Sequence, residues 1–253
     1  MKTKWDYTEA AAFYAKRPGY ALSIVDKIMD IANVKSGDWV CDIGAGTGNL
    51  TLMLAKKNLN VIAVEPNEFM RTVGAAQTAA CDNVRWHDAL AEDTRLPADG
   101  FRLVTYASSF NVTDRQKSLI EAHRILKSDG FIACLWNNRD LDDPLHSQIE
   151  RLLKIHVPDY DCDRYGVRYE DQTRLIKSSN LFDDVQCYKD TFKHRFSRDD
   201  FIDNWRSHGT MHPQSKRGFS LLIEDIKRLL ESLDDKIFSV SYITQVWTAR
   251  KMR

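Results

Sequence analysis

The stretch that decides the fold reads Val40-Cys41-Asp42-Ile43-Gly44-Ala45-Gly46-Thr47-Gly48-Asn49-Leu50-Thr51. A short apolar run ends in an acid, passes through three glycines at every second position and continues into a helical pattern. Glycine allows positive φ and lets a ligand approach the backbone without meeting a Cβ atom. The N-terminus of the following helix offers unpaired N–H groups. The stretch therefore predicts a strand, a tight turn and a helix, with a cofactor bound at the turn.

The first half of the chain repeats this alternation of strand and helix. Apolar runs bounded by turn residues predict strands at 39–42, 61–64, 84–88, 103–106 and 131–136. Amphipathic stretches predict helices at 50–57, 67–80 and 113–126. Strands that alternate with helices through short turns indicate an α/β fold, a doubly wound and mostly parallel sheet.

The second half is less regular. Helices are predicted at 144–155, 172–179, 199–207 and 221–233, and strands at 185–196 and 239–249. The two late strands would form an antiparallel pair at one edge, which completes a seven-stranded sheet. Residues 1–35 are predicted as helices ahead of the sheet, and residues 137–170 and 197–236 as helical cap insertions over its ligand-binding edge.

Composition excludes several classes of protein. The 253 residues carry 36 Lys and Arg against 36 Asp and Glu, which lacks the basic excess of a dedicated nucleic-acid binder. No run approaches the ~20 apolar residues of a membrane span. The 5 cysteines include no Cys-x-x-Cys pair, so neither a disulfide framework nor a metal site is expected. We predict a cytoplasmic protein, a monomer or homodimer, without bound metal and with no nucleic-acid or membrane partner.

The glycine spacing separates two kinds of nucleotide cofactor. A dinucleotide fingerprint has the form G-x-G-x-x-G/A, and its third glycine would fall on Asn49. The pattern here is instead Asp42-x-Gly44-x-Gly46-x-Gly48. This pattern resembles that of the class I S-adenosylmethionine-dependent methyltransferases, whose fold is a Rossmann-like seven-stranded sheet. Residues 36–253 would then be the methyltransferase domain and residues 1–35 a lid.

The resemblance extends beyond the turn and implies a set of cofactor contacts. Glu65 follows the second predicted strand, where the family places an acid that binds both ribose hydroxyls. Asp88 follows the third strand, at the family's adenine contact. The Arg17 side chain is implied as a lid contact to the methionine carboxylate of S-adenosylmethionine. The full set is Asp42, Gly44, Ala45, Gly46, Gly48, Glu65, Pro66, Asp88, Ala89, Leu90, Ser108 and Arg17.

The turn at 126–130 resembles the family's Leu-Lys-Pro-Gly-Gly turn. Two further segments resemble small-molecule members of the family, including relatives of trans-aconitate methyltransferase. They are Trp136-Asn137-Asn138-Arg139-Asp140 and the N-terminal Tyr14-x-x-Arg17-Pro18-x-Tyr20. The chain departs from the family at three places. Arg102 replaces an acid, Ser128-Asp129 replaces Pro-Gly, and Asn111 stands where many relatives have an aromatic residue. The last departure leaves the type of acceptor open.

The resemblance implies methyl transfer by in-line displacement to oxygen, nitrogen or carbon of a small-molecule acceptor. Enzymes that methylate exocyclic amines of nucleic acids carry an Asp/Asn-Pro-Pro-aromatic turn, whereas this chain has Ser108-Ser109-Phe110-Asn111. Candidate residues for the acceptor pocket are Ser109, Asn111, Trp136, Arg139, Tyr165 and Trp205. Candidate catalytic residues are His208, His212 and Tyr14.

Two other classes of function stay open. An NAD-dependent oxidoreductase would bind NAD and not S-adenosylmethionine. A non-catalytic S-adenosylmethionine-binding module would keep the glycine turn and Glu65, but cap side chains would fill the space above residues 108–111.

Overall fold

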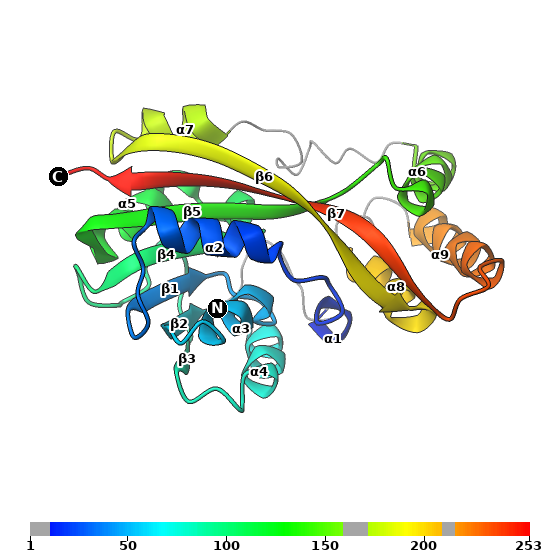
Figure 1. Cartoon of the computed structure of the whole chain (residues 1–253), viewed down its shortest axis with the longest axis horizontal. Coiled ribbons are helices and arrows are strands. Elements are labelled where there is room, and N and C mark those ends of the chain that lie inside the picture. The colour runs from blue at the N-terminus through cyan, green and yellow to red at the C-terminus, as the bar shows by residue number, and fades with distance from the viewer. Residues whose placement is uncertain (1–10, 159–171, 209–215) are drawn as a thin grey trace.

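The computed structural model describes residues 11–158, 172–208 and 216–253. These residues form a seven-stranded sheet of order β3-β2-β1-β4-β5-β7-β6 (Figure 1). Its strands are β1 (Trp39–Ile43), β2 (Asn60–Val64), β3 (Val84–His87), β4 (Phe101–Ala107), β5 (Leu126–Arg139), β6 (Phe182–Ser197) and β7 (Ile237–Lys251). The first five strands pair in parallel, and β7 is antiparallel to both β5 and β6. The predicted doubly wound, mostly parallel sheet is confirmed.

Helices cover both faces of the sheet. They are α1 (Ala11–Tyr14), α2 (Leu22–Ile31), α3 (Asn49–Ala55), α4 (Glu68–Gln77), α5 (Arg115–Ile125), α6 (Pro144–His156), α7 (Gln172–Ser178), α8 (Arg198–Arg206) and α9 (Lys216–Glu231), with the 3-10 turn η1 (Phe110–Val112). Side chains of α2 and α3 pack on one face of the central strands. Side chains of α5 and α7 pack on the other face.

Side-chain caps explain where several helices begin. The Asn67 side chain accepts a hydrogen bond from the Met70 N–H at the start of α4. Asp114 does the same for Lys117 N–H in α5, and Ser197 for Asp200 N–H in α8. Such caps satisfy N–H groups that the helix itself leaves unpaired.

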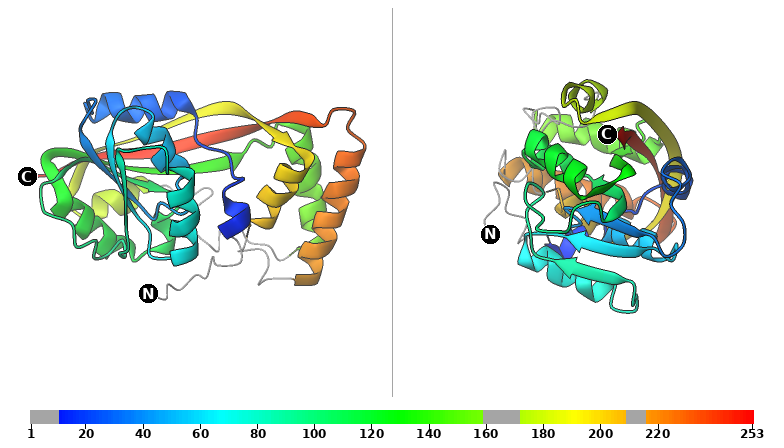
Figure 2. Two further views of the ribbon diagram at one scale, coloured as in Figure 1. Left: turned by 90° about the horizontal axis from the view of Figure 1, so that it is seen from below. Right: turned by 90° about the vertical axis from the view of Figure 1, so that its left-hand side faces the viewer.

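Three helices form a unit beside the sheet, here called the helical subdomain: α6, α8 and α9 (Figures 1 and 2). They pack with the far ends of β6 and β7 around a separate apolar core that includes Leu153, Phe201 and Ile226. Residue 137 was predicted to begin a cap, but β5 continues to Arg139. The strand continues because β7 pairs with it as far as Arg139 and Tyr242.

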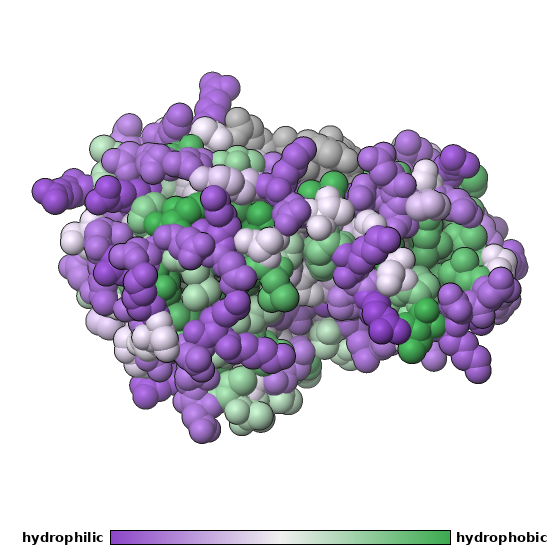
Figure 3. Space-filling model, in the orientation of Figure 1, coloured by the Kyte–Doolittle hydropathy of each residue, from purple (hydrophilic) through white to green (hydrophobic). Residues whose placement is uncertain are grey.

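The short helix α1 lies between the sheet and the helical subdomain, as Figure 2 shows. It contacts both α4 and α8. On the face seen in Figure 3, hydrophilic residues are spread over both parts of the molecule. Among the described residues, no helix has both the length and the apolar character needed to cross a membrane.

Candidate functional site

The glycine turn has the left-handed backbone that its sequence predicts. Gly44, Gly46 and Gly48 have φ of 66°, 57° and 84°. At Gly44 a Cβ atom would lie 2.4 Å from the Cβ of Ser109, so a side chain has no room there. Gly48 precedes α3 as its N-cap residue. The turn therefore brings bare backbone to the carboxyl ends of β1 and β4.

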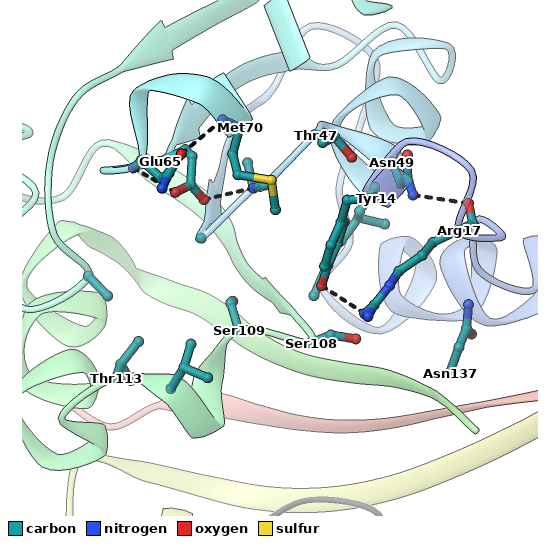
Figure 4. Close-up of a pocket in the computed structure, with 18 of the residues that line it drawn as sticks. Tyr14, Arg17, Thr47, Asn49, Glu65, Met70, Ser108, Ser109, Thr113 and Asn137 are labelled. Carbon is teal, nitrogen blue, oxygen red and sulfur yellow. Dashed lines mark hydrogen bonds between the residues drawn. The ribbon is translucent and has the colours of Figure 1, made fainter. Parts of the chain in front are cut away.

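Glu65 is held at the end of β2 by two backbone groups. Its Oε2 accepts from Gly46 N–H at 2.9 Å, and its Oε1 accepts from Asn67 N–H at 2.8 Å (Figure 4). Burial raises the pKa of this carboxyl, and the hydrogen bonds from Asn67 and Gly46 oppose that rise. Each carboxylate oxygen has a further lone pair. The side chain lines the cavity and can accept two more hydrogen bonds from a ligand.

Asp42 lies behind the turn and does not line the cavity. It is fully buried, and its two oxygens accept hydrogen bonds from the hydroxyls of Thr51 and Thr105, each at 2.7 Å. Burial raises the pKa of this carboxyl to about 6. The carboxylate thus connects β1, β4 and α3, and the structure places it away from the position expected for a direct cofactor contact.

The predicted adenine contact at Asp88 also lies off the cavity. Its side chain is 54% exposed and pairs with Arg71 at 3.4 Å, while Ala89 is buried in the apolar core. The following residues Leu90, Ala91 and Glu92 line the cavity instead. Glu92, which the sequence analysis did not single out, therefore lines the cavity in this segment, and Asp88 does not.

One cavity of about 620 Å³ joins these groups to the helical subdomain. Part of its wall is the glycine turn with Glu65, Pro66, Asn67 and Met70, and another part is the segment 90–92 with residues 112–114 and Lys117. The N-terminal segment contributes Tyr14, Arg17, Pro18 and Tyr20. The sheet contributes Ser108 and Ser109 just after β4, Asn137 and Arg139 of β5, and Tyr242 of β7. The helical subdomain contributes Asn204 and Trp205 of α8, with His208 just after that helix. Figure 4 shows the labelled side chains gathered around this space.

Arg139 and Trp205 form the wall on the side of the helical subdomain. The guanidinium of Arg139 pairs with Glu150 at 2.9 Å, and its Cζ lies 4.7 Å from the centre of the Trp205 ring. Trp205 is 1% exposed and stacks on His208, with ring centres 5.3 Å apart. These three side chains give the cavity a flat, partly cationic surface.

The tautomer of His208 follows from its partners. Its Nδ1 lies 2.9 Å from the Asn204 carbonyl oxygen and 3.3 Å from that of Trp205. A carbonyl only accepts, so Nδ1 carries the proton and Nε2 holds a lone pair in the neutral ring. Burial, assisted by Arg17 and Arg139, holds the pKa of His208 well below its usual value. The cavity therefore presents a neutral imidazole whose Nε2 is unprotonated.

Arg17 and Tyr14 form part of the wall between α1 and the glycine turn. Arg17 Nη1 donates to the Tyr14 hydroxyl at 2.9 Å, and the guanidinium stacks on the Tyr14 ring. Asn49 Nδ2 donates to the Arg17 carbonyl oxygen at 3.1 Å. Asn49, which breaks the dinucleotide pattern, thus fixes the N-terminal segment against the turn.

Two predicted pocket residues lie outside the cavity wall. Trp136 packs edge-on against Trp247 and donates to Asn111 Oδ1 at 3.4 Å. Neither Trp136 nor Asn111 lines the cavity. Ser108 and Ser109 do, and Ser109 donates to the Ile43 carbonyl oxygen at 2.6 Å. Tyr165 and His212 lie outside the described residues.

Sequence reasoning missed several wall residues. Tyr242 comes from β7 and Asn204 from α8, and only the antiparallel return of β7 beside β5 brings them to the ends of the parallel strands. No local motif marks either residue. Within the described ranges, no cluster of three or more His, Cys, Asp or Glu is arranged to hold a metal ion.

Comparisons with known proteins place this domain. A methyltransferase-domain family model matches residues 40–130. An uncharacterized methyltransferase of Mycobacterium tuberculosis is 31% identical over 132 residues, which is 51% of this chain and 50% of that protein. The ubiquinone/menaquinone biosynthesis C-methyltransferase UbiE of Vibrio vulnificus is 32% identical over 136 residues, 51% of this chain and 52% of that enzyme. The chain thus spans about half the length of these curated relatives.

Solved structures agree on the fold over nearly the whole chain. A protein of Anaeromyxobacter dehalogenans described as a candidate type II methyltransferase superposes with a TM-score of 0.65 at 18% identity, covering 93% of this chain and 98% of that one. Phosphoethanolamine N-methyltransferase 2 of Haemonchus contortus, in complex with phosphomonomethylethanolamine and S-adenosylhomocysteine, gives a TM-score of 0.58 at 16% identity, covering 99% and 58% of the two chains. Residues 40–130 thus match a methyltransferase domain, and the strand order and the superpositions show that the chain has a Rossmann-like methyltransferase fold.

Proposed function

We propose that this protein transfers the methyl group of S-adenosylmethionine to a small-molecule acceptor bound between the sheet edge and the helical subdomain. The observation that carries the proposal is the buried Glu65 carboxylate, which is aimed into the cavity with a free lone pair on each oxygen. A carboxylate in this state suits two neighbouring hydroxyls, such as those of a ribose. The residues of the cavity fit this cofactor.

The cofactor would be held by the glycine turn, Glu65, Leu90 and Arg17. When bound, it supplies an electrophilic methyl group on a sulfonium. The protein's main contribution is alignment, because a well-oriented pair of reactants can lower the barrier by ~7–11 kcal/mol. Arg17 is suited to a carboxylate because its guanidinium presents several N–H donors in one plane.

The acceptor would lie against Ser109, Arg139 and Trp205, with His208 beside it. His208 Nε2 can accept the proton of an acceptor hydroxyl or amine as the new bond to the methyl group forms. The guanidiniums of Arg17 and Arg139 disfavour a positively charged imidazolium, so they then favour release of that proton to water. Tyr14 is fixed by Arg17 and serves as a wall residue in this arrangement.

The two other classes of function have less support. The side chain of Asn49 fills the place where a dinucleotide turn needs glycine or alanine. Ser108 and Ser109 border the open cavity, whereas a non-catalytic module would have this space filled.

Calorimetry tests the proposal directly. We expect S-adenosylmethionine and S-adenosylhomocysteine each to bind at about one molecule per chain. NAD serves as the control ligand. Binding of NAD without binding of S-adenosylhomocysteine would refute the proposal.

A further inference from the structure

Arg17 is hydrogen-bonded to both sides of the cavity. Its carbonyl oxygen accepts from Asn49, at the start of α3 and next to the glycine turn. Its guanidinium reaches the other side, where Nε donates to Ser207 Oγ at 2.8 Å and Nη2 to the Ser207 carbonyl oxygen at 3.0 Å. One residue thus connects the cofactor turn to the end of α8.

The connection continues from Ser207 to His208 through a single carbonyl group. Ser207 Oγ accepts from Arg17 and donates to the Asn204 carbonyl oxygen at 2.6 Å. That same oxygen accepts from His208 Nδ1 at 2.9 Å. Ser207 is fully buried, so water does not compete for these bonds. A change in the position of the Arg17 guanidinium therefore reaches the imidazole through three hydrogen bonds.

The Arg17 guanidinium also has capacity for a ligand. Of its five N–H donors, three are engaged by Ser207 and Tyr14, which leaves one on each terminal nitrogen. Both partners are neutral, and no acidic side chain of the described residues pairs with Arg17. A half-buried guanidinium whose partners are neutral is stabilised by a charge-assisted hydrogen bond to a bound anion.

We infer that Arg17 is a positioning residue that couples cofactor binding to the placement of His208. The inference rests on the proposed function, because it takes the cofactor's carboxylate as the anion that Arg17 binds. Once fixed by that carboxylate, the guanidinium holds Ser207, and Ser207 holds the carbonyl that orients the imidazole. The acceptor side of the cavity is thus completed when the cofactor is in place. Because such coupling is reciprocal, an occupied acceptor side also strengthens cofactor binding.

Hydrogen exchange in the presence of S-adenosylhomocysteine tests this coupling without knowledge of the acceptor. The reporters are the amides of Ser207 and His208, which donate to the Asp203 and Trp205 carbonyl oxygens at 3.0 and 3.1 Å. In the unmodified protein we expect the ligand to slow exchange of the peptide 203–208 by about threefold or more. Ser207→Ala should bind the ligand within about threefold of the unmodified protein, yet lose at least half of this added protection.

Two further variants complete the experiment. Arg17→Lys keeps the positive charge but cannot hold Ser207 and a carboxylate together, so it should still bind ligand and lose the added protection. Lys16→Met removes a 2.7 Å ion pair to Asp200 at the other end of α8 and should behave as the unmodified protein. Full protection in both Ser207→Ala and Arg17→Lys would overturn the inference. Ligand binding without any protection in the unmodified protein would overturn it too, whereas no binding at all would refute the proposed function itself.

Discussion

The Glu65 carboxylate accepts a hydrogen bond from the backbone N–H of Gly46 at 2.9 Å, which links the end of β2 to the glycine turn after β1. This bond orients the carboxylate and also fixes the turn that faces it. A glutamate and a glycine 19 residues apart therefore form one hydrogen-bonded element of the cavity wall. The raised pKa of the carboxyl shows the cost of burying it, a cost that bound hydroxyls would offset.

Glu65→Ala should weaken binding of S-adenosylhomocysteine by about 1.5–3 kcal/mol, the range for loss of a charged hydrogen-bonding partner. Glu68→Ala is the matched control, because Glu68 is exposed in the first turn of α4. Calorimetry on both variants measures the difference. Equal affinities would show that Glu65 is not the ribose ligand.

The parallel half of the fold could be predicted because its signals are local. Each strand there is a short apolar run, and each following helix has a periodic apolar face. The end of β5 could not be predicted in this way, because its pairing with Tyr242 depends on a strand about 100 residues later. Residues 137–139 consequently belong to the sheet although their composition resembles that of a loop.

Glu92→Ala should weaken S-adenosylhomocysteine binding about fivefold, whereas Asp88→Ala should leave it unchanged. Glu92 lines the cavity and its carboxylate also accepts from Asp114 N–H at 2.6 Å. Asp88 points to Arg71 and solvent. Loss of one hydrogen bond between Glu92 and the ligand would cost about 1 kcal/mol of binding free energy. Calorimetric titration with S-adenosylhomocysteine measures both affinities. Weaker binding by Asp88→Ala than by Glu92→Ala would show that Asp88 is the adenine contact.

In the candidate site, as in the fold, local features could be predicted from the sequence and long-range contacts could not. The glycine turn and Glu65 could be found from their spacing, since each follows its strand directly. Asp42 and Asp88 also lie at the ends of their predicted strands, but their neighbours Thr51, Thr105 and Arg71 determine where the carboxylates point. These contacts join separate elements of the fold, so the positions of the two acids in the sequence do not reveal where their side chains point.

His208→Gln should abolish most methyl transfer while leaving cofactor binding intact. Loss of a proton acceptor in the reaction costs ~10²–10⁴-fold in rate. The protein is incubated with a metabolite extract and methyl-labelled S-adenosylmethionine, and labelled products are counted. His123→Gln is the control, because His123 contacts the Met252 carbonyl oxygen and does not line the cavity. An unchanged labelling rate in His208→Gln, with normal S-adenosylhomocysteine binding, would show that this imidazole is not the base.

His146 should make the folded state sensitive to mild acid. Its ring is fully buried between Phe201 and Tyr242. Burial, with a smaller contribution from Arg139, lowers its pKa to about 4. Between pH 6.5 and about 4 the unfolded chain binds a proton at this residue that the folded chain does not. The contribution of His146 to the free energy of unfolding is therefore fully present above pH 6.5. It is lost as the pH falls, by up to about 3 kcal/mol.

His146→Phe keeps an aromatic ring in the same apolar core and removes the titration. Urea unfolding at pH 7 and pH 5 should therefore show a smaller loss of stability for the variant than for the unmodified protein. The comparison uses the difference between the two proteins because other groups titrate in the same range. Asp42, with a folded pKa of about 6, contributes with the opposite sign, since its folded form binds the extra proton. An identical pH dependence in both proteins would show that His146 is not the group responsible.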